Sequence, residues 1–137
     1  MSQPAGPETL DTMKEEEFEK EVSRLAGLPR DRARLLIHAT LETLADRLTA
    51  GEARDLASQL PAPMKDWLIP STQEAEDFGL DEFVRRVSDR ARVRPEEARE
   101  AVHAVFVTLQ EAVTSGEFDD VMSQLPQQYR ELARAQP

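Results

Sequence analysis

The stretch TAGEARDLASQLP at residues 49–61 returns as TSGEFDDVMSQLP at residues 114–126. The offset of 65 residues that superimposes these stretches also places Phe18 on Phe83, and the two copies align without a gap from residue 17 onwards. A repeat at a fixed period indicates that one structural unit occurs twice along a chain. We therefore expect two tandem repeats in this protein.

Apolar residues recur at helical spacing within each copy, and Gly or Pro separates the periodic segments. Phe18, Val22 and Leu25 form one such stripe, and Gly27 followed by Pro29 marks a boundary between helices. The β-branched run at 102–107 would suit a strand, but its helix-forming flank favours a helix. The predicted helices cover 13–26, 29–48, 52–60 and 62–69 in the first copy, and 95–113, 117–125 and 127–135 in the second.

The pattern Thr-x-Gly-Glu precedes the third helix of each copy and predicts a capping box. In that motif the threonine side chain accepts a hydrogen bond from the backbone three residues on, and the glutamate reaches back to the threonine backbone. A proline then ends the short helix and suits the first turn of a fourth one. The predicted caps are Thr49 with Glu52 and Thr114 with Glu117, and the prolines are Pro61 and Pro126.

A repeat of roughly 60 residues buries too little surface to be stable alone, so the two copies are expected to share one core. The predicted fold is all-α: two tandem three-to-four-helix repeats packed with pseudo-two-fold symmetry into one helical globule. Phe18 and Phe83 are the expected anchors of the first helices, and a buried Trp67 is expected to close the first repeat. The predicted layout is a disordered tail at 1–12, repeat 1 at 13–69, a linker at 70–80 anchored by Ile69 or Phe78, and repeat 2 at 81–137.

The chain of 137 residues has a formal net charge of −10 and contains no cysteine. Strong negative charge opposes binding to nucleic-acid phosphates and to anionic lipid surfaces, and favours basic partners for charge-steered encounters. Without cysteine the sequence offers no disulfide and no thiolate metal site. It shows no signal-peptide pattern and no apolar stretch of membrane-spanning length. We therefore expect a cytoplasmic monomer or homodimer with no nucleic-acid or membrane partner.

The signature Thr-x-Gly-Glu-x-x-Asp-Leu-x-x-Gln-Leu-Pro, after an alanine- and leucine-rich helix, resembles a bacterial family called domain of unknown function 2267. Residues 49–61 fit the pattern closely, and residues 114–126 fit it with Phe-Asp-Asp-Val in place of Ala-Arg-Asp-Leu. The likeness extends from Phe18 to Leu132. It implies a small prokaryotic all-helical tandem-repeat protein, and it supplies no catalytic residues. The excess of arginine over lysine, 14 to 3, also suggests a GC-rich bacterial genome.

Two pairs of polar residues occupy equivalent positions in the repeats. His38 and His103 lie beside the apolar stripe of each long helix, where a two-fold fold would make them a paired metal or proton-sensitive site. The alternative, which we favour, is a half-buried histidine that hydrogen-bonds locally. Gln59 and Gln124 precede Leu-Pro at a helix end. They suit a polar ligand-binding pair or, as we prefer, satisfaction of last-turn carbonyls.

The first helices of the two copies carry opposite charges. If they pack across a two-fold axis, Glu21 pairs with Arg86. The rival interpretation is that the arginine strip docks an acidic partner, and a third is that both faces are simply solvated. The acidic residues are Glu15, Glu16, Glu19 and Glu21, and the basic ones are Arg85, Arg86, Arg90, Arg92 and Arg94.

The sequence favours a non-enzymatic protein-interaction or adaptor module with an unknown protein partner and no cofactor. Asp55 and Asp120 offer two carboxylates for acid–base chemistry, but no partner nucleophile is identifiable. The alternative function is a small-molecule or metal-binding protein with its site at the repeat interface near His38 and His103.

Overall fold

A computed structural model describes residues 13–70 and 74–134, and this part of the chain contains eight helices and no strand. The all-α prediction is confirmed. The predicted tail at 1–12, part of the linker at 71–73 and the last residues at 135–137 lie outside the described residues. The helices are α2 (Glu15–Ala26), α3 (Arg30–Arg47), α4 (Ala50–Ala57), α5 (Ala62–Lys65), α6 (Leu80–Ala91), α7 (Pro95–Ala112), α8 (Ser115–Ser123) and α9 (Gln127–Arg134).

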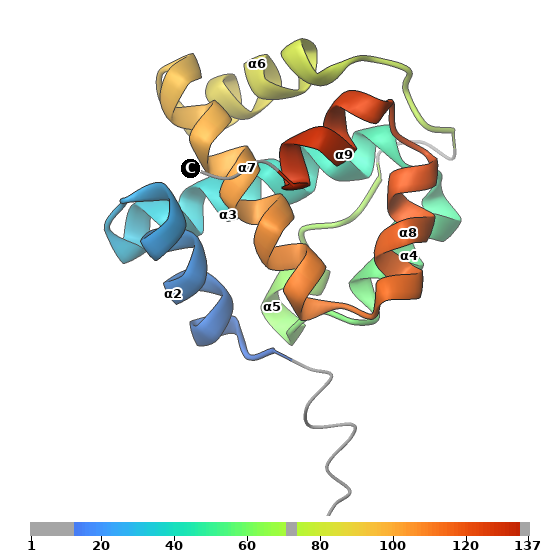
Figure 1. Cartoon of the computed structure of the whole chain (residues 1–137), viewed down its shortest axis with the longest axis horizontal. Coiled ribbons are helices and arrows are strands. Elements are labelled where there is room, and N and C mark those ends of the chain that lie inside the picture. Colours follow the sequence, from blue (N-terminus) through green and yellow to red (C-terminus); the bar gives the residue numbers. More distant parts are fainter. Residues whose placement is uncertain (1–12, 71–73, 135–137) are drawn as a thin grey trace, which may run out of the picture.

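The two longest helices, α3 and α7, lie at the centre and contact each other (Figure 1). Helix α2 packs on both of them, and so does α6. Each of these two helices therefore covers the long helix of the other half of the chain: α2 covers α7, and α6 covers α3. At one end of the molecule α4 lies against α8, while α9 packs on α7 and α8 and α5 packs on α2. The pseudo-two-fold symmetry itself stays a prediction.

Helix boundaries follow from local backbone chemistry. The backbone N–H of Lys14 donates to Glu17 Oε1 at 2.9 Å at the start of α2. Gly27 ends α2 in the left-handed conformation, at φ 68°, which glycine adopts without steric cost. Arg92 ends α6 in the same conformation, at φ 60°, without that freedom. Pro95 occupies the first turn of α7, where its missing N–H is not needed.

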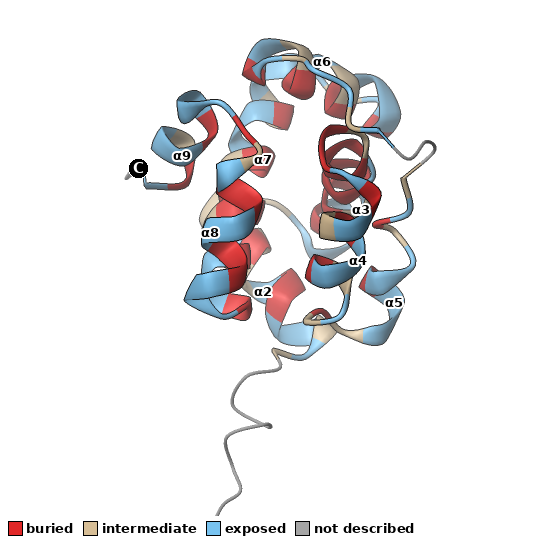
Figure 2. Cartoon of the chain, turned by 90° about the vertical axis from the view of Figure 1, so that its right-hand side faces the viewer, coloured by how far each residue is buried: buried red, intermediate tan, exposed pale blue. Residues whose placement is uncertain are grey.

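The core is aliphatic with an aromatic centre, and Figure 2 shows buried residues along most of α3. Phe18 and Phe83 are fully buried, as predicted. The ring of Phe83 meets Phe106 and Tyr129 edge-on, at centroid distances of 5.9 and 5.4 Å. Such edge-to-face contacts add to the stabilisation that burial itself provides. The β-branched run at 102–107 is helical, because its apolar side chains pack on neighbouring helices.

Phe78 anchors the segment that joins the two halves, and Ile69 does not. Ile69 is 69% exposed. The carbonyl of Phe78 accepts hydrogen bonds from Arg47 Nε at 2.7 Å and from the Tyr129 hydroxyl at 3.2 Å. The guanidinium of Arg86 lies 3.9 Å from the centre of the Phe78 ring, within range of a cation–π contact.

Trp67 packs against the core but is only partly buried, so it is more exposed than the buried closing residue expected from the sequence. Its ring stacks on His38 with centroids 4.6 Å apart and planes 20° from parallel. The short helix α5 ends at Lys65, two residues earlier, and leaves the indole at the edge of the core.

Replacing Trp67 with alanine should therefore destabilise the fold by about 1–2 kcal/mol, since it removes a partly exposed stack. Phe83→Ala is the matched control and should cost about 3–5 kcal/mol, as expected for a fully buried aromatic residue. Urea unfolding followed by circular dichroism measures both. Equal losses in the free energy of unfolding would show that the Trp67 side chain contributes as much to core packing as Phe83 does.

Candidate functional site

The junction between α4 and α8 is built from residues of the repeated motif. Gln124 Oε1 accepts from the backbone N–H of Thr49 at 3.0 Å, and Gln59 Oε1 accepts from that of Thr114 at 2.9 Å. Each glutamine amide also reaches the hydroxyl of the same threonine, at 3.3 and 3.4 Å. The glutamine at the end of one short helix therefore caps the start of the other.

These contacts correct two sequence predictions. The glutamines were expected to satisfy carbonyls of their own helix ends, yet their amides bind the threonines of the other half. The capping boxes are half right: Thr49 and Thr114 accept from the N–H groups of Glu52 and Glu117, at 3.3 and 3.2 Å. The glutamates do not reach back, because the threonine N–H groups already donate to the glutamines.

Glu52 and Glu117 instead approach each other across the junction. Together with Asp55 they place one carboxylate oxygen each within 4.8 Å of one another. The Oε2 atoms of Glu52 and Glu117 are both buried and meet no hydrogen-bond donor among the described residues. Glu117 is 9% exposed, whereas Asp55 is exposed. The capping-box pattern predicts a local role for both glutamates, and their equivalent positions in the repeat are the one sequence signal that relates them.

The surroundings of Glu117 disfavour its ionised form. Burial is the main cause, followed by the contact with Glu52 and the negative charges of Glu52, Asp55 and Asp120. Together they raise the pKa of the Glu117 carboxyl from 4.5 to about 8. No cation among the described residues pairs with it. At neutral pH the Glu117 carboxyl can therefore hold a proton, which supplies the missing donor.

His38 makes the local contacts of the interpretation that we favour, not those of a paired metal site. His38 Nε2 lies 3.2 Å from Glu42 Oε2 on the same helix, and its ring stacks on Trp67. His103 is half-buried. The described group with three potential metal ligands is Glu52, Asp55 and Glu117, and it includes neither histidine.

Most residues of the two charged strips are paired within the chain. Glu21 pairs with Arg24 at 2.6 Å, so the predicted contact with Arg86 is wrong. The physical reason is that α3 and α7 lie between the oppositely charged helices. Arg86 pairs with Glu82 at 2.9 Å and with Glu76 at 3.0 Å.

The remaining residues of the two charged strips are also paired within the chain, with three exceptions. The buried carboxylate of Glu19 lies 3.5 Å from Arg30 and 3.3 Å from Arg34. The other pairs are Glu15 with Arg34 at 3.0 Å, Arg85 with Glu82 at 2.7 Å and with Asp89 at 2.9 Å, and Arg90 with Asp46 at 2.8 Å. Glu16, Arg92 and Arg94 are exposed, and their side chains pair with none of the described residues.

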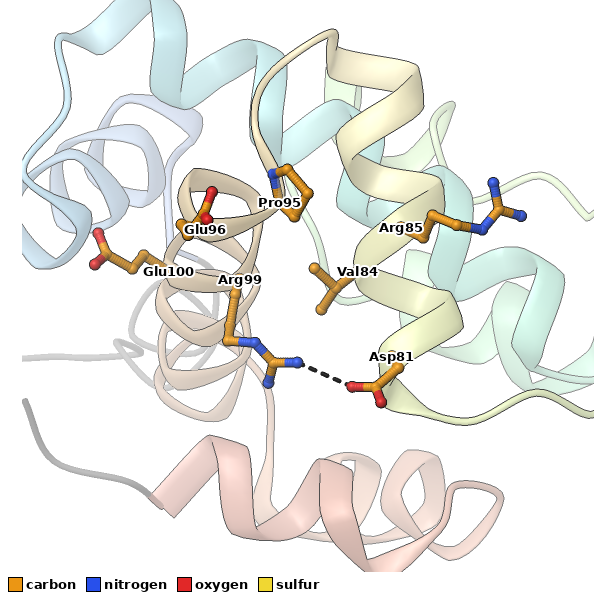
Figure 3. Close-up of a pocket in the computed structure, with 7 residues that line it drawn as sticks. All are labelled: Asp81, Val84, Arg85, Pro95, Glu96, Arg99 and Glu100. Carbon is orange, nitrogen blue, oxygen red and sulfur yellow. Dashed lines mark hydrogen bonds and ion pairs between the residues drawn. The ribbon is translucent and has the colours of Figure 1, made fainter.

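Two open pockets border the turn between α6 and α7. The first, of about 490 Å³, lies between these helices and is lined by Val84, Pro95 and charged residues (Figure 3). Asp81 and Arg99 form an ion pair 3.0 Å apart across it, and Figure 3 shows the Arg85 guanidinium pointing away from that pair. Both arginines of this pocket are therefore already paired within the chain.

The second pocket, of about 450 Å³, lies between the start of α3 and the same turn. Leu35 and Arg92 line it, together with Arg32 and Asp31. Leu35 is 48% exposed, one of two large apolar side chains that are this open among the described residues. Arg32 pairs with Glu97 at 2.8 Å, so Arg92 is the unpaired cation of this pocket.

The protein is therefore a small all-helical protein. It has a polar junction between α4 and α8 and two surface pockets beside the turn between α6 and α7. The sequence model of the family described as "Uncharacterized conserved protein (DUF2267)" matches residues 15–132. This match covers most of the chain, and the protein belongs to the DUF2267 family, as the resemblance predicted. No curated protein matches the chain. Among the described helices, none is both long and apolar enough to span a bilayer.

The glutamine caps should contribute measurably to stability. Gln59→Ala leaves the Thr114 N–H without its acceptor, and we expect a loss of about 1 kcal/mol in the free energy of unfolding. Gln110→Ala, on the exposed face of α7, is the control and should change stability by less than about 0.5 kcal/mol. Chemical denaturation measures the free energy of unfolding of both variants. Equal values would show that the glutamine cap does not contribute to stability.

The raised pKa of Glu117 predicts a pH dependence of stability. From about pH 4.5 to pH 8 the folded protein holds a proton that the unfolded chain releases, so the contribution of this group to the free energy of unfolding falls as pH rises. Glu117→Gln should remove this fall and be more stable than the wild type at about pH 8. Thermal unfolding across this range tests it, with exposed Glu100→Gln as the control that keeps the wild-type curve. Parallel curves for wild type and Glu117→Gln would contradict the prediction.

Proposed function

We propose that the protein is a non-enzymatic interaction module that docks an acidic segment of a partner protein in the pocket beside Leu35 and Arg92. The observation that carries this proposal is the conformation of Arg92. A residue with a side chain pays about 1 kcal/mol for left-handed backbone, and the equivalent position in the first copy is Gly27. Arg92 adopts this unfavourable conformation, and its charge has no partner among the described residues.

The surroundings of Arg92 define the chemistry of the proposed partner. Leu35 offers an apolar contact, and Arg92 and Arg94 offer exposed guanidinium groups for carboxylates. The matching segment has one large apolar side chain flanked by Asp or Glu. Because the net charge of −10 repels an acidic chain at long range, recognition depends on these short-range contacts and on the shape of the pocket.

The acidic helix α2 is a weaker candidate surface for a basic partner. Glu15, Glu19 and Glu21 pair with arginines of the same chain, and a partner would have to displace those pairs. Arg92 needs no such exchange. This difference supports the pocket at the turn over the acidic helix.

Selection of a displayed random-peptide library on the immobilised protein tests the proposal. We expect enriched peptides that combine one large apolar residue with acidic neighbours and that lose binding to Leu35→Glu and Arg92→Gly. Arg92→Gly should also raise the free energy of unfolding by about 0.5–1 kcal/mol, because glycine adopts the left-handed conformation freely. Loss of binding in a more stable variant cannot come from unfolding.

Arg54→Ala is the matched control, because Arg54 is an exposed arginine elsewhere on the surface without a side-chain partner among the described residues. It should bind the same peptides as the wild type. Peptides without acidic residues, or peptides that bind Arg92→Gly as well as the wild type, would overturn this docking site.

A further inference from the structure

The junction of α4 and α8 holds two buried carboxylate oxygens that lack a donor. Glu52 Oε2 and Glu117 Oε2 are both inaccessible to solvent and bind no N–H or O–H group among the described residues. The Glu117 side chain is more than nine-tenths buried and faces the carboxylate of Glu52 from the neighbouring helix. Buried charged oxygens are costly unless a proton or a cation compensates them.

The usual local donors are already engaged. The N–H groups of Thr49 and Thr114 donate to glutamines, and those of Glu52 and Glu117 donate to the threonine hydroxyls. A negative side chain in the first turn of a helix is commonplace, because it faces the positive end of the helix dipole. The dipole does not explain why two such side chains turn toward each other and leave an oxygen each without a partner.

The geometry of the group is compatible with a divalent cation. One oxygen from each of Glu52, Asp55 and Glu117 lies within 4.8 Å of the other two, close enough for all three to bind one ion. Calcium accepts six to eight oxygens in irregular arrangements, whereas magnesium requires near-ideal octahedral geometry, so three carboxylates with open positions around them favour calcium. Carboxylate oxygens are hard ligands that suit calcium and magnesium rather than copper or zinc.

We propose that Glu52, Asp55 and Glu117 form a calcium site that joins α4 to α8. Glu52 and Asp55 come from one helix, three residues apart on the same face, and Glu117 comes from the other. Asp55 is exposed, so water has access to the positions that three carboxylates leave open in a six- to eight-coordinate ion. The bound ion ties the N-terminal half to the C-terminal half beside the glutamine caps. This inference is independent of the docking site at Arg92.

The test is titration of CaCl2 into the chelator-treated full-length protein, followed by calorimetry and by thermal unfolding. It is done at about pH 8.5, because carboxylates bind metal in their ionised form. We expect one ion per chain and a melting temperature that rises with calcium concentration by mass action. Glu52→Gln and Glu117→Gln should each weaken binding by at least about tenfold, because each removes one of three charged ligands.

Glutamine keeps the shape of the side chain and removes repulsion, so both variants are expected to fold without calcium. The control is Glu100→Gln, which removes one negative charge at an exposed position, as the other two variants do, and should bind like the wild type. No binding at about 10 mM CaCl2, beyond the weakest protein calcium sites, would overturn the site and leave a proton on the Glu117 carboxyl. Binding that survives in both variants would also overturn it, as would a preference for MgCl2.

Discussion

The structure depends on the burial of two long helices that neither half of the chain can cover alone. Helices α3 and α7 are buried along much of their length. Within its own half, α3 packs mainly on α2, and α7 packs mainly on α6 and α9. A half of roughly 60 residues buries too little surface to be stable, so α2 covers α7 and α6 covers α3. This exchange makes one core from Phe18 at one side to Tyr129 at the other, and it places α4 beside α8.

Once α4 and α8 are adjacent, the repeated motif acts across the junction rather than within one helix. Gln124 satisfies the N–H of Thr49, and this frees Glu52 from the reach-back of a capping box. The freed carboxylate then meets Glu117, its equivalent in the other copy, in a setting that burial makes unfavourable for charge. The caps and the carboxylate group are therefore parts of one arrangement, in which polar residues that stabilise the junction also concentrate negative charge there.

On the surface most arginines are paired with acidic residues of the same chain. Arg86 and Arg90 of α6 bind Asp46 of α3, and Arg86 also binds Glu76 of the joining segment, so these two residues of the basic strip hold α6 against the first half of the chain. The Phe78 ring contacts the guanidinium groups of Arg47 and Arg86 and anchors the joining segment to the core. Arg92 differs from these paired arginines, because it has a left-handed backbone and no side-chain partner among the described residues. The turn after α6 is therefore the stronger docking candidate.

The helical elements, the caps at Thr49 and Thr114, and the buried anchors Phe18 and Phe83 could all be predicted from the sequence. These features depend on residues close in the chain or on periodic burial, which local spacing records. Which side chains meet, in contrast, depends on how the helices pack. The glutamines found the threonines of the opposite half, and the oppositely charged helices were held apart by the two long helices between them. His38 contacts Glu42 on its own helix, while Glu52 and Glu117 come together across the junction. Equivalence in a repeat says that two residues have similar surroundings; whether they touch depends on how the helices cross, and no local pattern encodes that crossing.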